Sequence, residues 1–391
     1  MDEIGVTNTA RSWTRIDGVD CLRALAIFYV LMNHINMRLL GGHVPYTKGL
    51  APQFVTSLVW QGQAGVQIFF AVSGFLITST TIKRWGTVGA VRLRDFYLMR
   101  FARIAPLLLT LLAVLSLLHA LRARDYIVSA KVGGLGGALF AALTLHVGLL
   151  EASKGYLPAN WDILWSLGVE EVFYLVFPLA CWLLGRGKGL VLLLGLFVAL
   201  GPFARTLFTG GNPVWQEYSY LGGMDAIALG CLTALLLASR PISHKAVLIC
   251  LGAGSALMVF CLVCEPQMRR LGLEKTGLGM TILALGACMV IAASSQSRWQ
   301  AHWIFRPLLA YGRRSYEVYL THMFVVFACF DLFVRAGKPL RLVPLLFVDA
   351  IMASGILGEV VGRFYSEPAN RWLRGRFGHG PKSLGSVIQP K

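Results

Sequence analysis

Residues 22–40 read LRALAIFYVLMNHINMRLL, an apolar run long enough to cross a lipid bilayer as a helix. Spanning the hydrocarbon takes about 20 residues. Ten further runs of this kind follow, at residues 64–82, 104–121, 133–151, 167–185, 189–208, 219–238, 246–264, 277–294, 315–334 and 342–362. The first run lacks the small-residue cleavage site of a signal peptide, so we expect it to remain as the first membrane helix.

The composition agrees with a membrane protein. Of the 391 residues 56% are hydrophobic and only 14% are charged, which is more apolar surface than a soluble core could bury. The net charge of +17 comes from short loops between the apolar runs, which favours a topology signal over nucleic-acid binding. We therefore predict an all-α, polytopic integral membrane bundle, with one domain over 1–362 and a flexible, basic cytoplasmic tail over 363–391.

The distribution of basic residues predicts the number of crossings. Both terminal segments are basic, through Arg11, Arg15 and Arg23 at the start and through Arg363, Arg371, Arg374, Arg376, Lys382 and Lys391 at the end. Basic flanks stay in the cytoplasm, as does the most basic predicted loop, 83–103. Ten crossings keep both termini there, which requires that the glycine-rich run 133–151 does not cross. We expect this run to be re-entrant or partly inserted, with protein or a water-filled cavity around its backbone.

Two ionisable residues share one face of the first predicted helix. Arg23 and His34 are eleven residues apart, and at about 100° per residue this is three turns plus about 20°. About 16 Å separate them along the axis, so His34 lies near mid-membrane and Arg23 at the cytoplasmic mouth. A neutral imidazole at this depth is suited to act as a general base. The alternative is a histidine that hydrogen-bonds between helices.

Two adjacent carboxylates occur in the run WSLGVEEVFY at residues 165–174. Glu170 and Glu171 diverge by about 100° on a helix, so only one of them can face a given cavity. That carboxylate could orient His34 or hold an acceptor hydroxyl. Alternatively, both lie at the helix N-terminus, where the positive end of the helix dipole favours them.

A pair of arginines lies at the start of a later run. Arg100 and Arg103 are three residues apart, on neighbouring faces of one helical turn. Forked guanidinium groups suit phosphate, of which coenzyme A carries three, but such a pair also serves as a positive-inside anchor.

Other polar groups within apolar runs have less specific signals. Asp225 and His322 either line an acceptor site or hydrogen-bond between helices. Gln67 and Ser73 are typical of close helix packing, and we assign them no chemistry. The CxxC pair formed by Cys261 and Cys264 has no second pair, so no metal is expected.

Taken together, these segments resemble the membrane-bound acyltransferase family 3, whose bacterial members O-acylate envelope glycans, exopolysaccharides, nodulation factors and some macrolides. The similarity covers most of the chain. It rests on five segments, which are residues 20–26 with 33–34, 65–77, 96–106, 165–174 and 315–322. The family's Arg-x10-His motif maps to Arg23 and His34, its Arg-x-x-Arg motif to Arg100 and Arg103, and its Ser-x-x-x-Glu-Glu motif to Ser166, Glu170 and Glu171. Cys21 departs from the family's usual glycine, and Thr321 stands where tryptophan often precedes the histidine.

The resemblance implies transfer of an acyl group, in the simplest case acetyl, from cytosolic acyl-CoA to a hydroxyl of a carbohydrate acceptor. The implied catalytic residues are His34, as general base or acyl relay, with Arg23, Glu170 and Glu171. Arg100 and Arg103 would bind the donor, and Ser166, Asp225 and His322 the acceptor. The expected location is the bacterial cytoplasmic membrane. Some family members carry a fused extracytoplasmic esterase-like domain; without one, the chain would complete transfer alone or pass the group to a partner.

Two other functions fit the same residues. The acceptor could be a small molecule such as a macrolide. The buried ionisable groups could instead line the path of a proton-coupled transporter or flippase, which would need no acyl donor.

Overall fold

The computed structural model describes residues 16–297 and 299–377, and every regular element within these ranges is helical. The α-helices are α1 (Asp17–Gly41), α2 (Pro52–Val59), α3 (Gly62–Trp85), α4 (Leu93–Ala120), α5 (Gly134–Leu143), α6 (Val147–Lys154), α7 (Leu164–Leu184), α8 (Gly189–Ala204), α9 (Pro213–Tyr218), α10 (Tyr220–Ser239), α11 (His244–Val263), α12 (Glu265–Arg270), α13 (Leu278–Gln296), α14 (Arg306–Arg313), α15 (Ser315–Arg335), α16 (Val343–Val361) and α17 (Glu367–Phe377). Single turns of 3-10 helix occur at Val88–Ala90, Arg124–Tyr126, Ala130–Val132, Ala159–Trp161, Leu207–Thr209, Trp303–Phe305 and Leu340–Leu342. The basic residues Arg11, Arg15, Lys382 and Lys391 lie outside the described ranges.

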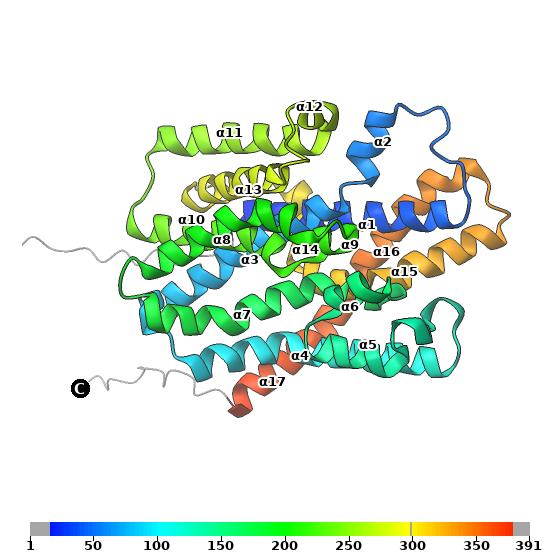
Figure 1. Ribbon diagram of the computed structural model, residues 1–391, viewed down its shortest axis with the longest axis horizontal. Helices are drawn as coiled ribbons and strands as arrows, with labels where there is room; N and C mark the ends of the chain where they lie inside the picture. The colour runs from blue at the N-terminus through cyan, green and yellow to red at the C-terminus, as the bar shows by residue number, and fades with distance from the viewer. Residues whose placement is uncertain (1–15, 298, 378–391) are drawn as a thin grey trace, which may run out of the picture.

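The long helices run side by side along the longest axis of the molecule (Figure 1). In the described chain, nine helical segments are long and apolar enough to cross a membrane: Asp17–Gly41, Pro52–Trp85, Leu93–Ala120, Ala159–Leu184, Pro213–Ser239, His244–Val263, Leu278–Gln296, Ser315–Arg335 and Leu340–Phe377. Helix α8 is apolar but shorter, at 16 residues. The predicted all-α polytopic bundle is confirmed.

The run 133–151 does not form one continuous helix. It is divided into α5 and α6, of 10 and 8 residues, and at about 1.5 Å per residue neither reaches across the hydrocarbon. The helical segments on either side of Gly133 meet at 90°, and this glycine has φ 93°, a left-handed conformation that other residues rarely adopt. Both short helices lie at the end of the bundle far from α17 (Figure 1).

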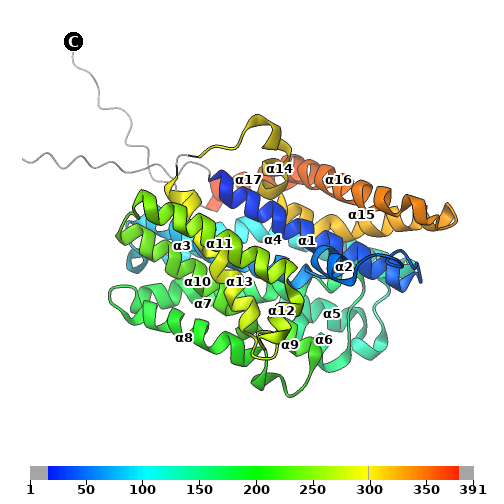
Figure 2. The same ribbon diagram turned by 90° about the horizontal axis from the view of Figure 1, so that it is seen from above.

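The start of α1 and helix α17 lie at the same end of the bundle in both views (Figures 1 and 2). We call this the α17 end and the other the α5 end. The described chain begins and finishes at one end of the bundle, and nine crossings would place its two ends on opposite faces. The shorter apolar helix α8 is therefore the candidate for a tenth crossing.

Two helices begin earlier than the apolar runs indicate. The segment 83–103 was predicted to be a loop, but α4 starts at Leu93 and takes in its second half. Arginine side chains reach water from within a helix, so the helix can continue past its apolar part. Helix α7 starts at Leu164, which places Glu170 and Glu171 in its second turn and not at its N-terminus. All four predicted charged positions on α4 and α7 therefore lie on regular helix.

Helices α3 and α10 pack closely through glycine. A Cβ on Gly74 would collide with the carbonyl oxygen of Ile227, and one on Gly230 would collide with that of Ala71. Small residues allow this approach of two backbones, which is a common way for membrane helices to associate. The close contact places α3 at the centre of the bundle, where its other faces meet α1 and α7.

Candidate functional site

A cavity of about 330 Å³, which we call the inner cavity, opens between α1, α3, α4, α7 and α15. Its volume lies within the range of small-molecule sites, about 300–1,000 Å³. Five of the nine predicted site residues line it: Arg23, Arg100, Arg103, Ser166 and Glu170. Side chains that are far apart in the sequence, from five helices, therefore meet in one place.

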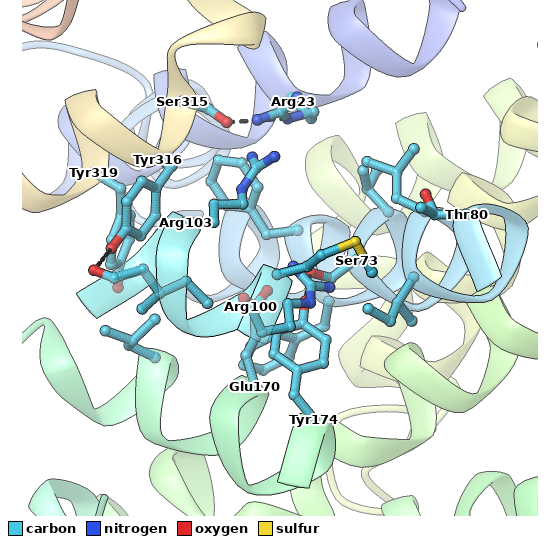
Figure 3. Close-up of a pocket in the computed structure, with 18 of the residues that line it drawn as sticks. Arg23, Ser73, Thr80, Arg100, Arg103, Glu170, Tyr174, Ser315, Tyr316 and Tyr319 are labelled. Carbon is cyan, nitrogen blue, oxygen red and sulfur yellow. Dashed lines mark hydrogen bonds between the residues drawn. The ribbon is translucent and has the colours of Figure 1, made fainter. Parts of the chain in front are cut away.

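The arginines enter the inner cavity from two sides. Arg23 donates from Nε to Ser315 Oγ at 3.1 Å and lies 3.7 Å from Asp20. The guanidinium group of Arg100 lies 3.8 Å from the ring centroid of Tyr174, a cation–π contact. Figure 3 shows Arg103 between the pair of Arg23 and Ser315 on one side and the side chain of Arg100 on the other. Three positive groups thus converge on one space.

Ser166 and Glu170 lie four residues apart on one face of α7, and both face the inner cavity. The Ser166 hydroxyl hydrogen-bonds the Tyr319 hydroxyl at 2.6 Å. Glu171 does not line the cavity, in agreement with the expectation that only one of the two carboxylates can face it. One Glu171 oxygen is buried without a hydrogen-bond partner among the described residues. Glu170 is therefore the carboxylate with access to a ligand.

The His34 ring pairs with His322. His34 Nδ1 lies 2.9 Å from the Val30 carbonyl oxygen, and His322 Nδ1 lies 2.6 Å from that of Tyr319. A carbonyl only accepts, so in the neutral rings both Nδ1 atoms carry hydrogen. His322 Nε2, 3.2 Å from His34 Nδ1, is then an acceptor. This arrangement leaves the His34 Nε2 lone pair without a hydrogen-bond partner in the described chain.

The spacing of Arg23 and His34 predicts that both face one neighbour, and both contact α15, through Ser315 and His322. Neither histidine lines the inner cavity. The link is Tyr319, which lines it and whose ring centroid is 5.8 Å from that of His322. The imidazole pair therefore lies directly behind one wall of the inner cavity.

Asp225 lies away from the inner cavity. Its fully buried carboxylate pairs with Arg205 at 2.7 Å and accepts hydrogen bonds from Gln67 at 2.9 Å and Thr281 at 2.6 Å. Of the two roles left open by the sequence, the structure gives Asp225 the interhelical one. Gln67 has the packing role expected of it.

Several residues that line the inner cavity were not predicted from the sequence. Ser73, to which we assigned no chemistry, lines it and hydrogen-bonds the Tyr174 hydroxyl. Tyr174 and Tyr319 also line it. Helical spacing could have identified both tyrosines, because Tyr174 follows Glu170 by four residues and Tyr319 precedes His322 by three.

A second cavity of about 790 Å³, the outer cavity, adjoins the first and shares Arg23 and Arg103 with it. Basic residues at the end of α3 and at the α14–α15 junction also line it: Lys83, Arg84, Arg313 and Arg314. Together the two cavities form a basic route from the α17 end into the bundle.

Comparison with known proteins places the bundle from α1 to α16 in one family. A family model described as an acyltransferase domain matches residues 16–361. The chain is similar to O-acetyltransferase OatA of Staphylococcus aureus strain NCTC 8325 / PS 47, at 24% identity over 388 residues that cover 96% of this chain and 60% of that protein. OatA of strain MRSA252 is also 24% identical, over 91% of this chain and 57% of its own length. The chain thus spans about 60% of the curated relatives it matches, and no solved structure matches it.

Proposed function

The chain belongs to the acyltransferase family whose model matches residues 16–361, and we propose that it moves an acyl group, in the simplest case acetyl, from acyl-CoA to a hydroxyl of a carbohydrate acceptor. The names of its relatives, O-acetyltransferases, support acetyl as the group and oxygen as the acceptor atom. The observation that carries the proposal is the inner cavity, where Arg23, Arg100, Arg103 and Glu170 meet in front of the His34–His322 pair.

The donor enters from the α17 end. This end holds the basic last turn of α3, with Lys83 and Arg84, and basic flanks of membrane helices face the cytoplasm, where acyl-CoA is made. The phosphates bind near Arg103, which faces both cavities, and the pantetheine arm extends into the inner cavity. In this orientation the α5 end faces outward, and the protein resides in the bacterial cytoplasmic membrane.

His34 acts as the general base. Its free Nε2 takes the proton of the acceptor hydroxyl while the hydroxyl oxygen attacks the thioester carbonyl; the C–S bond breaks, and the sulfur leaves with that proton as CoA-SH. In a second form of the proposal, Nε2 attacks the thioester carbonyl, the C–S bond breaks and CoA leaves as the thiolate. The acceptor hydroxyl oxygen then takes the acyl group from Nε2 as that N–C bond breaks, and its proton ends on CoA-SH. Both forms require a path from the inner cavity to His34, which does not line it. Tyr319 lines the cavity beside His322, so movement of its side chain would open such a path.

Replacement of His34 tests this role. Purified His34→Ala should lose about 10²- to 10⁴-fold in transfer rate, the usual size of a general-base contribution, and still bind acetyl-CoA. His244→Ala, an exposed histidine at the start of α11, is the matched control and should keep full activity. Near-normal turnover by His34→Ala would remove His34 from the mechanism. If the unaltered protein binds no acetyl-CoA, the donor assignment fails and a transport function is favoured.

The acceptor is identified by mass spectrometry of envelope and secreted glycans from cells with and without the protein. Loss of acyl esters from a glycan on deletion supports a carbohydrate acceptor. Unchanged glycans with an altered small-molecule product would assign the macrolide type of acceptor instead.

A further inference from the structure

Helix α17 forms part of the walls of both cavities, although it lies beyond residue 361, where the family match ends. Glu367 and Asn370 line the outer cavity, and Arg374 lines the inner one. These positions, spaced by three and four residues, form one stripe along a helix. One face of α17 is therefore turned toward the proposed route of the donor.

Specific contacts hold α17 in this position. A π-helical segment, Gly362–Ser366, joins it to α16. At this segment Tyr365 hydrogen-bonds Thr110 at 2.6 Å and the Pro106 carbonyl oxygen at 3.2 Å, both on α4. Segments of π-helix are rare and often occur at functional sites. Here the segment continues α16 into α17, which packs against α4 (Figure 1).

A second contact comes from the α14–α15 junction. Arg314 binds Glu359 at 2.8 Å, before the π-helical segment, and Glu367 at 2.5 Å, after it. Since Arg314 directly precedes Ser315, the partner of Arg23, the same junction supports both α17 and the floor of the inner cavity. The position of Arg374 is thus set by the bundle and not by α17 alone.

Arg374 is surrounded by positive charge. Its electrostatic neighbours are Arg84, Arg100 and Arg103, and none of these four guanidinium groups forms an ion pair with a carboxylate of the described chain. Glu170 acts on Arg100 and Arg103 from a longer distance. Like charges brought together repel one another unless an anion binds between them. Four arginines from three helices therefore make an anion site at the edge of the inner cavity.

We propose that Arg374 binds a phosphate group of the nucleotide half of the donor, so that α17 completes the donor site from outside the family domain. This inference rests on the proposed function, which supplies a donor that carries phosphates. It deepens that function by assigning to the C-terminal helix a part in donor affinity.

A charge series at position 374 tests the inference in the full-length protein. Acetyl-CoA affinity should decrease about tenfold in Arg374→Ala, because a charge-assisted hydrogen bond to phosphate is lost. It should decrease further in Arg374→Glu, where a negative charge faces the phosphate, and stay near the original value in Arg374→Lys, where the positive charge is kept. The matched control is the same series at Arg376, which stacks on Trp372 and Phe377 of the same helix and lines neither cavity. It should change the affinity less than twofold.

Two outcomes overturn the inference alone. Equal acetyl-CoA affinity across the Arg374 series would show that this side chain does not touch the donor. Equal weakening in the lysine and alanine variants, together with a lower melting temperature without ligand, would give Arg374 a structural role. If the unaltered protein has no affinity for acetyl-CoA, the proposed function fails as well, so the two failures are distinguishable.

Discussion

Two buried groups of charges in this bundle differ in how their charges are balanced. Around Asp225, the guanidinium group of Arg205 donates to the carboxylate, to the carbonyl oxygens of Gly222 and Gly277, and to Thr281. In the inner cavity, Arg100 and Arg103 face open space without an ion-pair partner in the described chain. A buried charge with a full set of partners belongs to the fold, whereas arginines that line a cavity without a direct ion pair point to a ligand.

The largest expected effect comes from breaking the paired group. Arg205→Ala should lower the free energy of unfolding by about 3–5 kcal/mol, because Asp225 would keep a buried charge without its partner. Thermal unfolding of the detergent-purified protein measures this. Arg240→Ala, an exposed arginine at the end of α10, is the control and should leave the melting temperature unchanged. An equally small shift for Arg205→Ala would mean that the network around Asp225 is not structural.

The unpaired group should behave in the opposite way. Arg103→Ala should leave the melting temperature unchanged but weaken acetyl-CoA binding about 10- to 100-fold, the value of a hydrogen bond to a charged group. Titration calorimetry and thermal unfolding on one preparation measure both quantities. A lower melting temperature without a change in acetyl-CoA affinity would give Arg103 a structural role like that of Arg205. The two groups of charges would then not differ in function.

The histidine pair lies between these extremes, since both rings are hydrogen-bonded, with His322 buried and His34 partly buried. His322→Ala should reduce kcat about two- to tenfold with unchanged donor affinity, because one neutral hydrogen bond that orients His34 is removed. His322→Gln should recover part of the rate, as its amide oxygen can accept from His34 Nδ1. A rise in KM alone, or no recovery with glutamine, would contradict a positioning role for His322.

The smallest effect is expected from a buried carboxyl group at the α5 end. Burial and the neighbouring Asp162 raise the pKa of Glu151 above its ordinary value of 4.5. The folded protein therefore holds a proton that the unfolded chain releases, so stability is complete below pH 4.5 and declines as the pH rises above it. Glu151→Gln should flatten this decline and raise Tm at pH 8 by about 1–2 °C. Parallel pH–Tm curves for the two proteins would contradict the raised pKa.

Much of the fold was predictable, because each apolar run carries its own signal. A run of about 20 apolar residues crosses lipid as a helix, because a helix satisfies its own backbone hydrogen bonds. The glycine-rich run 133–151, which was expected to differ from the others, forms two short helices instead of one long one. The limits of α4 and α7 were not predictable from hydropathy, since a helix continues past its apolar part wherever its polar side chains find water or partners. Arg100 and Arg103 lie in the extension of α4, and Ser166 lies in that of α7.

The candidate site was predictable only where spacing along one helix defines a face. Arg23 and His34, or Ser166 and Glu170, have such spacing. Ser73, Tyr319 and Arg374 gain their importance from neighbours on other helices, which no local pattern encodes. Asp225 illustrates the same limit, because only the position of Arg205 decides between an acceptor site and a structural network.

Helix α8, with 16 residues, is about 24 Å long, several ångströms less than the hydrocarbon thickness of about 30 Å. Arg205, which follows its last residue, is fixed to α10 and α13 by hydrogen bonds, so α8 cannot shift along its axis to reach the far headgroups. As a crossing helix, α8 is therefore too short for a bilayer of ordinary thickness, and hydrophobic mismatch would thin the lipid beside it. Shorter acyl chains would lower the elastic cost at this one helix.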